Sequence, residues 1–505
     1  MIDNTKPIRT RFAPSPTGYA HIGTVRTGLF AFLFARHYGG KAVLRVEDTD
    51  QSRKIDDAVD SLLRVLQTLG MDFDEGPYIE NGEIKQRGDY GPYIQSQRLE
   101  IYQRHAKELL DNKKAYYCFC SEQRLADLRQ EQTALKQPTK YDGQCRKLTE
   151  EEVSEKLTEL EASGQKPVIR QMIPDGGVTV NHDLVYGDIT YAHETLDDQV
   201  LLKSDGFPTY HLAVVVDDHE MQISHVIRAD DWLPSTPKHI LLYQDFGWEI
   251  PKFAHLPLIL NPDKTKLSKR KGDVAAEDFL KKGYLPQALV NFIVLLGWNP
   301  KTEQEVFSMQ ELIEQFELSK VNKSGAVFDL NKLDWMNAEY LRAMPVGELV
   351  ELCKPYWSEQ SLPWEAATPE YLESILSLEK DRLKKLSDVA DGRTDFYFNH
   401  PEPDAGMLVW KKSTQEETKQ NLTLTADLIR ITSDDILGDQ VKLEETIKKF
   451  IADHGLDNGS VLWPLRVAMT GLEKSPGPFE VTATIAKGRG REYIMERLQR
   501  AISSL

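Results

Sequence analysis

Cysteine is scarce in this chain of 505 residues, which contains four. So few cysteines do not build a disulfide framework across a chain of this length, so we expect a reduced, cytoplasmic protein. Long hydrophobic runs are also missing, because the longest apolar stretches, residues 29–35 and 288–296, fall short of the roughly 20 residues that span a bilayer. No apolar core follows the first residues, which predicts no signal peptide and no membrane association.

Positive charge is in deficit, because 62 lysines and arginines face 79 aspartates and glutamates, for a formal net charge of −17. Averaged over the whole chain, this acidic total argues against a polyanionic partner. The charges are unevenly distributed, however: residues 266–271 and 380–385 are basic, while acids concentrate in residues 150–161. Binding of RNA depends on where local cations face, so the net charge does not exclude an RNA partner.

The composition is otherwise that of a soluble globular protein, with 40% hydrophobic and 28% charged residues. At roughly 100–200 residues per domain, the length predicts about three to five domains. Near the N-terminus the pattern predicts a strand over residues 8–13, a helix over 24–38, a strand over 41–46 and a helix over 57–69. This alternation indicates an α/β fold with a doubly wound parallel sheet.

Two further regions depart from this alternation. From about residue 118 to 200 the pattern is irregular, with an acidic helix over residues 150–160 and strands around 178–191, which indicates an insertion between two halves of the sheet. The α/β pattern then resumes, with a helix over residues 236–246. After about Asn331 the chain is mostly helical. The expected helices cover residues 346–356, 369–390, 415–432, 441–454 and 490–503.

A proline-rich turn, residues 14–18, joins the first strand to the first helix. The N-terminus of a helix is a favourable anion site, because its backbone N–H groups and its dipole point outward. His21 adds a side chain able to donate to a phosphate oxygen. Neither a GxxxxGKS/T P-loop nor a GxGxxG follows the strand, so a nucleotide that binds here uses another device. For this segment alone, a tight turn with Thr24 as the helix cap is an equally good explanation.

A second segment places four cations within six residues, at positions 266–271. Lysine is a flexible point charge that can follow phosphate charge from the ground state to the transition state. A solvated basic loop is the commoner explanation of such a cluster by itself.

Together, the two segments resemble the paired ATP signatures of class I aminoacyl-tRNA synthetases. Residues 21–24 (HIGT) resemble the HIGH element of that class, and residues 266–270 (KLSKR) resemble its KMSKS element. Other segments are similar to glutamyl-tRNA synthetases of the bacterial type, in the same order and at compatible spacing, over nearly the whole chain. These segments are residues 11–18, 45–50, 203–213, 226–232 and 261–271.

The resemblance implies a two-step ligation of glutamate to tRNA. The substrate carboxylate attacks the α-phosphate of ATP to form an adenylate, and the 3′ end of tRNA-Glu then takes the glutamyl group, with AMP and diphosphate as the other products. Both steps need positioning and charge stabilisation more than a protein nucleophile. ATP is then a substrate, Mg²⁺ accompanies its triphosphate, and glutamate and tRNA-Glu are the other partners of an enzyme expected to be a monomer.

The resemblance also implies roles for individual residues. His21, Lys266 and Lys269 are the expected catalytic residues, with Lys269 as the main transition-state contact. The expected ATP contacts are Ser15, Pro16, Thr17, Gly18, His21, Gly23, Thr24, Lys266, Ser268 and Lys269. The expected glutamate contacts are Arg11, Ala13, Ser15, Glu47, Tyr210 and Arg228. Among these, the arginines suit the substrate carboxylates, because a guanidinium binds a carboxylate in a fork. Some family members have asparagine where this chain has Val214, which removes one polar contact.

Three of the cysteines, Cys118, Cys120 and Cys145, lie near the start of the insertion. Three thiolates leave a tetrahedral Zn²⁺ one ligand short. The family pattern CxC…YxxxC is intact here and implies Tyr141 as the fourth member of a site for one structural Zn²⁺. Another family pattern places histidine where this chain has Lys147. Three reduced cysteines without a metal remain the alternative. Cys353 has no motif around it and is expected in a core.

The resemblance also divides the chain into regions. The helical part resembles the anticodon-binding cage of bacterial glutamyl enzymes, in which Arg382 and Arg466 match positions that contact the anticodon; arginine suits recognition of an unstacked base edge. A solvated helix face is the alternative for Arg382. The expected regions are 1–117, first half of a Rossmann-type catalytic domain; 118–200, inserted acceptor-stem-binding domain; 201–250, second catalytic half; 251–335, KLSKR loop and stem contact; and 336–505, all-helical anticodon-binding region.

Three other functions stay open at this stage. A truncated paralogue that glutamylates a modified base of another tRNA lacks the anticodon half, so the length argues against it. A glutaminyl enzyme is disfavoured by the proline-rich loop and the helical C-terminal half. An RNA-binding or regulatory protein with an inactive catalytic domain is disfavoured because His21, Lys269, Arg11, Glu47 and Arg228 are all present.

Overall fold

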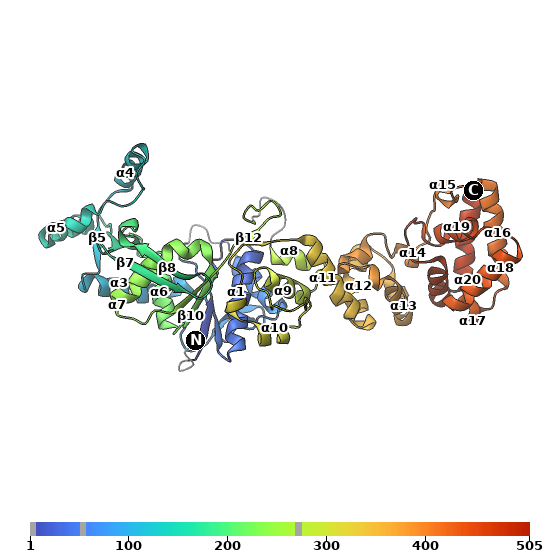
Figure 1. Cartoon of the computed structure of the whole chain (residues 1–505), viewed down its shortest axis with the longest axis horizontal. Coiled ribbons are helices and arrows are strands. Elements are labelled where there is room, and N and C mark those ends of the chain that lie inside the picture. The colour runs from blue at the N-terminus through green and yellow to red at the C-terminus, as the bar shows by residue number, and fades with distance from the viewer. Residues whose placement is uncertain (1–6, 51–56, 268–274) are drawn as a thin grey trace. The chain divides into compact units, whose positions relative to one another are not determined.

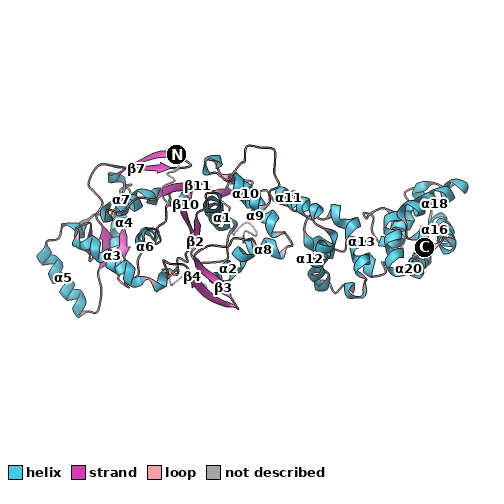
Figure 2. Cartoon of the chain, turned by 90° about the horizontal axis from the view of Figure 1, so that it is seen from below, coloured by secondary structure: helices cyan, strands magenta, loops and turns pink. Residues whose placement is uncertain are grey.

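The computed structural model describes residues 7–50, 57–267 and 275–505 of the chain. These residues form two compact units (Figure 1): Met1–Leu280 with Leu289–Leu330, and Lys281–Ala288 with Asn331–Leu505. Figure 2 shows the strands in the first unit, whereas the second unit is helical. The predicted α/β region followed by a helical region is therefore confirmed.

A parallel four-stranded sheet lies at the centre of the first unit. Strand β1 (Arg9–Phe12) lies between β2 (Lys41–Leu44) and β10 (His225–Ala229), and β11 (Lys252–Leu256) lies outside β10. The chain leaves β1 for β2 on one side and returns much later to β10 on the other, so the strand order reverses between β1 and β10. At such a switch point a ligand-binding crevice opens beyond the carboxyl ends of the strands.

Helix α1 (Ile22–His37) follows β1 and is buried along most of its length. It begins two residues before the predicted start at Thr24, because His21 caps it: the His21 Nδ1 atom accepts a hydrogen bond of 2.9 Å from the Gly23 backbone N–H. This bond satisfies one of the N–H groups that a helix N-terminus leaves without an intrahelical partner. The alternative in which Thr24 caps the helix is therefore wrong.

Four more helices accompany the central sheet, and three of them share a hydrophobic cluster with its residues Val43, Val226 and Phe253. The helix predicted over residues 57–69 is α2 (Ala58–Thr68), and the one predicted over 236–246 is α7 (Thr236–Phe246). Helix α6 (Tyr210–Glu220) is apolar and buried over Leu212–Val216 and continues into two buried acids, Asp217 and Asp218. Helix α3 is Leu99–Asp111.

Between β2 and β10 along the chain lie a small antiparallel sheet, in the order β5–β6–β9, and a separate hairpin of β7 and β8. The acidic helix is α5 (Glu150–Ala162). A capping box formed by Thr149 and Glu152 lies at its N-terminus. The strands are β5 (Ala115–Cys118), β6 (Val168–Gln171), β7 (Val178–Asp183), β8 (Gly187–Ala192) and β9 (Val200–Leu202). Before and between them come β3 (Gly76–Glu80), β4 (Glu83–Arg87) and α4 (Glu122–Ala134).

After β11 the chain forms a short parallel pair, β12 (Ile259–Leu260) with β13 (Ala326–Val327). Between these strands along the chain come α8 (Ala276–Lys281), α9 (Pro286–Leu295) and α10 (Met309–Gln315).

The second unit consists of helices around a single large hydrophobic cluster that includes the fully buried Trp357, Tyr397 and Leu465. Its helices are α11 (Leu330–Ala343), α12 (Val346–Glu359), α13 (Pro369–Glu379), α14 (Asp395–Phe398), α15 (Ala405–Leu408), α16 (Gln415–Ile431), α17 (Asp434–Leu437), α18 (Gln440–Asp453), α19 (Asn458–Thr470) and α20 (Pro478–Ser504). Within the described ranges, no helix is both long enough and apolar enough to cross a membrane.

Two predicted helices of this unit differ from the structure. The helix predicted over residues 369–390 ends at Glu379, and the chain continues in short 3₁₀ turns. One local and one long-range bond satisfy freed backbone groups: Asp388 accepts from the Lys384 N–H at 2.8 Å, and the Leu386 N–H donates to the distant Gly283 carbonyl at 2.9 Å. The helix predicted from Gly490 instead starts at Pro478 and kinks at Gly490, whose φ of 80° favours glycine.

Candidate active site

A cavity of about 1060 Å³ opens at the carboxyl ends of β1 and β10, where the strand order reverses. All six residues expected to contact glutamate line it: Arg11, Ala13, Ser15, Glu47, Tyr210 and Arg228. Seven of the expected ATP contacts line it too: Ser15, Pro16, Thr17, His21, Gly23, Thr24 and Lys266. Gly18 lines a smaller neighbouring pocket of about 180 Å³. Ser268 and Lys269 lie outside the described residues.

The hydrogen bond that caps α1 also determines the proton position of His21. Because Nδ1 accepts from the Gly23 N–H, the proton of the neutral imidazole lies on Nε2. The Nε2–H of this cavity-lining residue is therefore the donor that suits an anionic oxygen. The backbone around His21 is also joined to the segment after the basic loop, through a bridge to Ala275 and a bond of 2.9 Å from the Ala276 N–H to the Ala20 carbonyl.

Lys266 is placed by a turn that starts at Asn261. The Asn261 side-chain amide donates to the Lys266 carbonyl at 3.1 Å, and the Leu267 N–H donates to the Ile259 carbonyl at 2.9 Å. The Lys266 ammonium lies 3.0 Å from a carboxylate oxygen of Asp231, and both side chains are exposed. An exposed pair exchanges partners at little cost, so the ammonium can leave Asp231 for a phosphate.

One side of the cavity is formed by a cluster of buried ion pairs, here called the ion-paired cluster: Arg11, Arg45, Glu47, Arg98, Asp217 and Asp218. The Arg11 Nε–H donates to Asp218 at 3.1 Å, and Arg45 donates to Asp218 at 2.8 Å and to Glu47 at 3.0 Å. Arg45 is fully buried. It therefore joins the two cavity-lining residues Arg11 and Glu47 into one unit.

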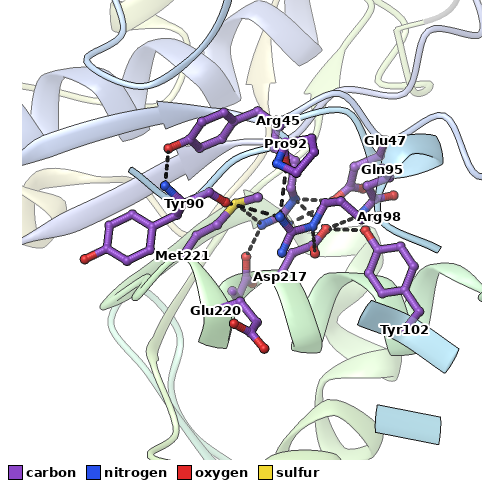
Figure 3. Close-up of polar contacts among 12 residues, drawn as sticks. Arg45, Glu47, Tyr90, Pro92, Gln95, Arg98, Tyr102, Asp217, Glu220 and Met221 are labelled. Carbon is purple, nitrogen blue, oxygen red and sulfur yellow. Dashed lines mark hydrogen bonds and ion pairs between the residues drawn. The ribbon is translucent and has the colours of Figure 1, made fainter. Parts of the chain in front are cut away.

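Asp217 anchors the far side of the ion-paired cluster (Figure 3). It accepts from Arg98 at 2.7 Å, from Gln95 at 2.8 Å and from the Tyr102 hydroxyl at 2.8 Å. The three arginines of the cluster balance its three carboxylates, as buried charges require. Burial raises the pKa of Glu47, and the Arg45 charge opposes that rise.

The sequence did not identify Arg45, Asp217 or Asp218 as part of the site. A signal was present in α6, where two adjacent acids directly follow the apolar run Leu212–Val216. Buried acids are rare unless they are paired, so such a position indicates a partner from elsewhere in the fold. The arginines that pair with these acids lie more than 100 residues away in the chain, so no local sequence pattern identifies them.

The other side of the cavity is formed around Arg228 by the histidine cluster, Arg228 with His211, His239 and His255. Arg228 donates to His255 at 3.0 Å, to His239 at 3.1 Å and to the Thr236 hydroxyl at 2.9 Å. Its Nη1 also lies 3.3 Å from the hydroxyl of Tyr210, the expected glutamate contact on α6. Arg228 is thus fixed in place by neutral groups.

The predicted zinc residues lie close together in the structure. The Sγ atoms of Cys118, Cys120 and Cys145 all lie within 4.8 Å of one another. The Tyr141 hydroxyl lies 3.7 Å from the Cys118 Sγ and 3.6 Å from the Cys120 Sγ. A hydrogen bond from Cys145 lowers the pKa of Cys118 to about 4. By contrast, Cys353 is buried in the core of the second unit, as predicted, and burial raises its pKa to about 12.

The two expected anticodon contacts lie in the second unit. Arg382 follows α13, and its Nη1 donates to Glu379, a fully buried carboxylate, at 2.8 Å. Arg466 is half-buried on α19, and among the described residues its Nε has no hydrogen-bond partner.

Comparison with known proteins identifies the class. Residues 7–335 match the family model of the catalytic domain of "tRNA synthetases class I (E and Q)", and residues 348–502 match an anticodon-binding domain. With the switch-point cavity and the two ATP-type segments, these matches place the chain in the class I aminoacyl-tRNA synthetases.

The individual relatives narrow the family. The glutamate–tRNA ligase of Alkaliphilus metalliredigens is 44% identical over 498 residues, which cover 97% of this chain and 98% of the relative. The glutamate–tRNA ligase of Chlorobaculum parvum is 41% identical, and the match covers 99% of this chain and 98% of that relative. A crystal structure of a glutamate–tRNA ligase from Elizabethkingia meningosepticum, in complex with its amino acid, matches with a TM-score of 0.88 at 34% identity and covers 99% of this chain and 100% of that one. The chain belongs to the glutamate–tRNA ligase family.

Proposed function

We propose that this chain is an ATP-dependent glutamate–tRNA ligase, which activates glutamate as its adenylate and transfers it to the 3′ end of tRNA-Glu. We further propose that it acts in the cytoplasm as a monomer. The observation that supports this function best is that the six expected glutamate contacts, from separate parts of the chain, line one cavity at the switch point of the sheet.

The cavity offers each group that glutamate requires. Glutamate has an ammonium group and two carboxylates, so its site needs one anion and two cations. Glu47 supplies the anion, and Arg11 and Arg228 supply the cations. Ser15, Tyr210 and the Ala13 backbone are neutral contacts in the proposal. All three charged residues are at most 7% exposed, so their interactions with a ligand are little screened by water.

For ATP, the proposed contacts are the segment from Ser15 to Thr24 and the KLSKR lysines. The His21 Nε2–H and the N-terminus of α1 suit a phosphate group. Lys266 and Lys269 are proposed to stabilise negative charge on the phosphates, and Mg²⁺ is proposed to accompany the triphosphate. Lys269→Ala should lower kcat more than it raises KM for ATP, because its contact should be strongest in the transition state.

The function is tested by charging separately transcribed tRNA-Glu and tRNA-Gln with purified protein, ATP and either radiolabelled glutamate or radiolabelled glutamine. We expect glutamyl-tRNA-Glu, together with AMP and diphosphate. Absence of product with every isoacceptor would mean that the catalytic domain is inactive, and charging with glutamine instead would identify a glutaminyl enzyme.

We also propose that Cys118, Cys120, Cys145 and Tyr141 bind one structural Zn²⁺. The thiol cluster supports this, and two N–H groups, of Phe119 and Arg124, donate to the Sγ atoms of Cys145 and Cys120. A bound zinc ion would cross-link β5 to the segment around Cys145. Metal analysis of protein purified without added zinc should give about one equivalent, and less than about a tenth of an equivalent would exclude the site.

For the tRNA, we propose that residues 118–200 bind the acceptor stem, that residues 251–335 contact the stem and that residues 336–505 bind the anticodon. Arg382 is proposed to contact an anticodon base, with Arg466 as a second contact. The catalytic parts are residues 1–117 and 201–250. Arg382→Ala should raise KM for tRNA-Glu and leave KM for glutamate unchanged.

A further inference from the structure

Arg228 differs from the other arginine of the proposed glutamate site in its counterions. Arg11 forms an ion pair with Asp218 at 3.1 Å. Arg228 is equally buried, at 4% exposure, yet within the described ranges its hydrogen bonds go to histidine, threonine and tyrosine side chains and to no carboxylate. The nearest carboxylate, that of Asp183, bonds to His255 and makes no hydrogen bond to Arg228. A buried charge without a directly bonded counterion is costly, so this arrangement is expected where a ligand supplies an anion that contacts the guanidinium.

The histidines that contact Arg228 are fixed in a neutral form. A guanidinium only donates, so His255 accepts through Nε2 and His239 accepts through Nδ1. The proton of His255 then lies on Nδ1, 2.6 Å from Asp183, and the proton of His239 lies on Nε2, 3.0 Å from the Nδ1 of His211. Protonation of either acceptor would break a bond to Arg228 and place two cations side by side.

The surroundings oppose such protonation. Burial lowers the pKa of His239, and the Arg228 charge lowers it further; burial also lowers the pKa of His255. Burial lowers the pKa of His211 to about 4. Asp183 is satisfied separately, because it also accepts from the backbone N–H groups of Val185 and Tyr186. The charged groups that act on the three rings include Arg228, Arg11, Asp183, Asp197, Asp230 and Lys238.

The two ends of glutamate can be assigned from this arrangement. Its α-carbon bears an ammonium and a carboxylate side by side, so that end needs an anion and a cation that are linked. Glu47 and Arg11 are linked in this way through Arg45 and Asp218. Arg228 belongs to a separate cluster and is left for the side-chain carboxylate. Glutamine has nearly the same shape as glutamate but carries a neutral amide there.

We infer that His239 and His255 are specificity-determining positioning residues, which fix Arg228 without neutralising it and so make the site select glutamate over glutamine. This inference rests on the proposed function. An amide in place of the carboxylate would leave the Arg228 charge buried and unpaired, whereas an internal acid next to Arg228 would remove the need for an anionic substrate.

The test is a matched pair of variants, His239→Asn and His239→Asp. Both place an oxygen near the position of Nδ1, so both can accept from Arg228, but the aspartate also supplies an internal counterion. The measurements are KM for glutamate, Ki for glutamine as a competitive inhibitor and KM for ATP. We expect His239→Asp to lower the preference for glutamate by about tenfold to a hundredfold relative to His239→Asn, with KM for ATP unchanged in both.

Three outcomes would count against the inference or the proposed function. An equal preference in the Asn and Asp variants would overturn the inference, because the charge at this position would then have no effect. An equal weakening of both ligands by the aspartate would also overturn it, because Arg228 would then bind the α-carboxylate that they share. If the wild-type protein charges no tRNA with glutamate, the proposed function itself fails. His225→Asn is the control, since His225 is buried on the same strand as Arg228 but does not line the cavity.

A measurement on the wild-type protein covers the case in which the Asp variant does not fold. Nitrogen-15 NMR of histidine-labelled protein reports the tautomer and charge of each ring. We expect both rings to titrate below the ordinary imidazole pKa, because burial lowers the pKa of His239 and of His255; the proton of the neutral ring should lie on Nε2 of His239 and on Nδ1 of His255. A ring that is charged at pH 6 or above would contradict the neutral arrangement.

Discussion

Arg11 and Arg228 lie near the carboxyl ends of adjacent strands, line the same cavity and are equally buried, yet their surroundings are opposite. The ion-paired cluster around Arg11 balances each cation with a carboxylate. The histidine cluster around Arg228 supplies hydrogen bonds from neutral groups, and the nearest carboxylate, Asp183, reaches Arg228 only through His255. Holding a guanidinium in place and neutralising its charge are therefore separate tasks. A site for an anion needs the first without the second on at least one side.

The two clusters also differ in what they contribute to folding. Removing one member of a buried ion-paired cluster leaves the other charges without partners, which costs several kcal/mol. Removing an arginine that only neutral groups contact also removes its own desolvation cost. We therefore expect the ion-paired cluster to matter for both stability and activity, and the histidine cluster mainly for activity.

The largest effect is expected for Arg45→Met. Methionine leaves Glu47, Asp217 and Asp218 with too few cations, so we expect a loss of about 3–5 kcal/mol in the free energy of unfolding, measured by urea titration. KM for glutamate should also rise strongly, because Arg45 positions both Glu47 and Arg11. Arg9→Met is the matched control: Arg9 forms a buried pair with Glu75 at 2.7 Å and does not line the cavity. It should lose stability without a change in KM, and a wild-type KM in Arg45→Met would contradict the positioning role.

The second effect compares Arg11→Met directly with Arg228→Met. Both should lower kcat/KM for glutamate by about a hundredfold or more, because each removes a cation from a desolvated site. Their stabilities should differ: Arg11→Met deprives Asp218 of a partner and should cost about 2 kcal/mol more than Arg228→Met. Thermal and urea unfolding of the two variants measure this difference. Equal stabilities would show that the neutral contacts of Arg228 matter as much for folding as the ion pairs of Arg11.

The third effect is the pH dependence of the free energy of unfolding that arises from His225, a buried histidine outside both clusters. Burial lowers the pKa of His225 from 6.5 to about 4. Between those values the unfolded chain binds a proton that the folded chain excludes. The stability from His225 is therefore complete above about pH 6.5 and decreases as the pH falls toward 4. His225→Phe should reduce the slope of stability against pH in this window by about 1.4 kcal/mol per pH unit, measured by urea titrations at pH 5 and pH 6. An unchanged slope would mean that His225 is protonated in the folded protein.

The smallest effect is expected for Asp231→Asn, which removes the partner of Lys266. Both side chains of this pair are exposed, so the free energy of unfolding should change by less than about 0.5 kcal/mol. KM for ATP should stay the same or fall slightly, because the lysine no longer exchanges a carboxylate for a phosphate. A loss of stability comparable to that of Arg45→Met would contradict the distinction between exposed and buried ion pairs.

The fold class and most element positions followed from local patterns. Helix α7 was predicted with its observed bounds, and β1, β2 and α2 were predicted to within two residues at each end, because hydrophobic periodicity and turn residues are local properties. One error lies where distant groups intervene. The helix predicted over residues 369–390 ends early because distant groups such as the Gly283 carbonyl satisfy the backbone of the broken segment.

For the site, the residue types can be read from the sequence, and its resemblance to a family indicates which of them to expect around glutamate and ATP. The tertiary structure alone decided their electrostatic states. The partner of Arg11 is Asp218, 207 residues away, and the acceptor for Arg228 is His255 on a neighbouring strand. Whether a buried arginine is neutralised depends on which side chains the fold brings within about 3 Å, and charge interactions are strong only at such short distances and away from water.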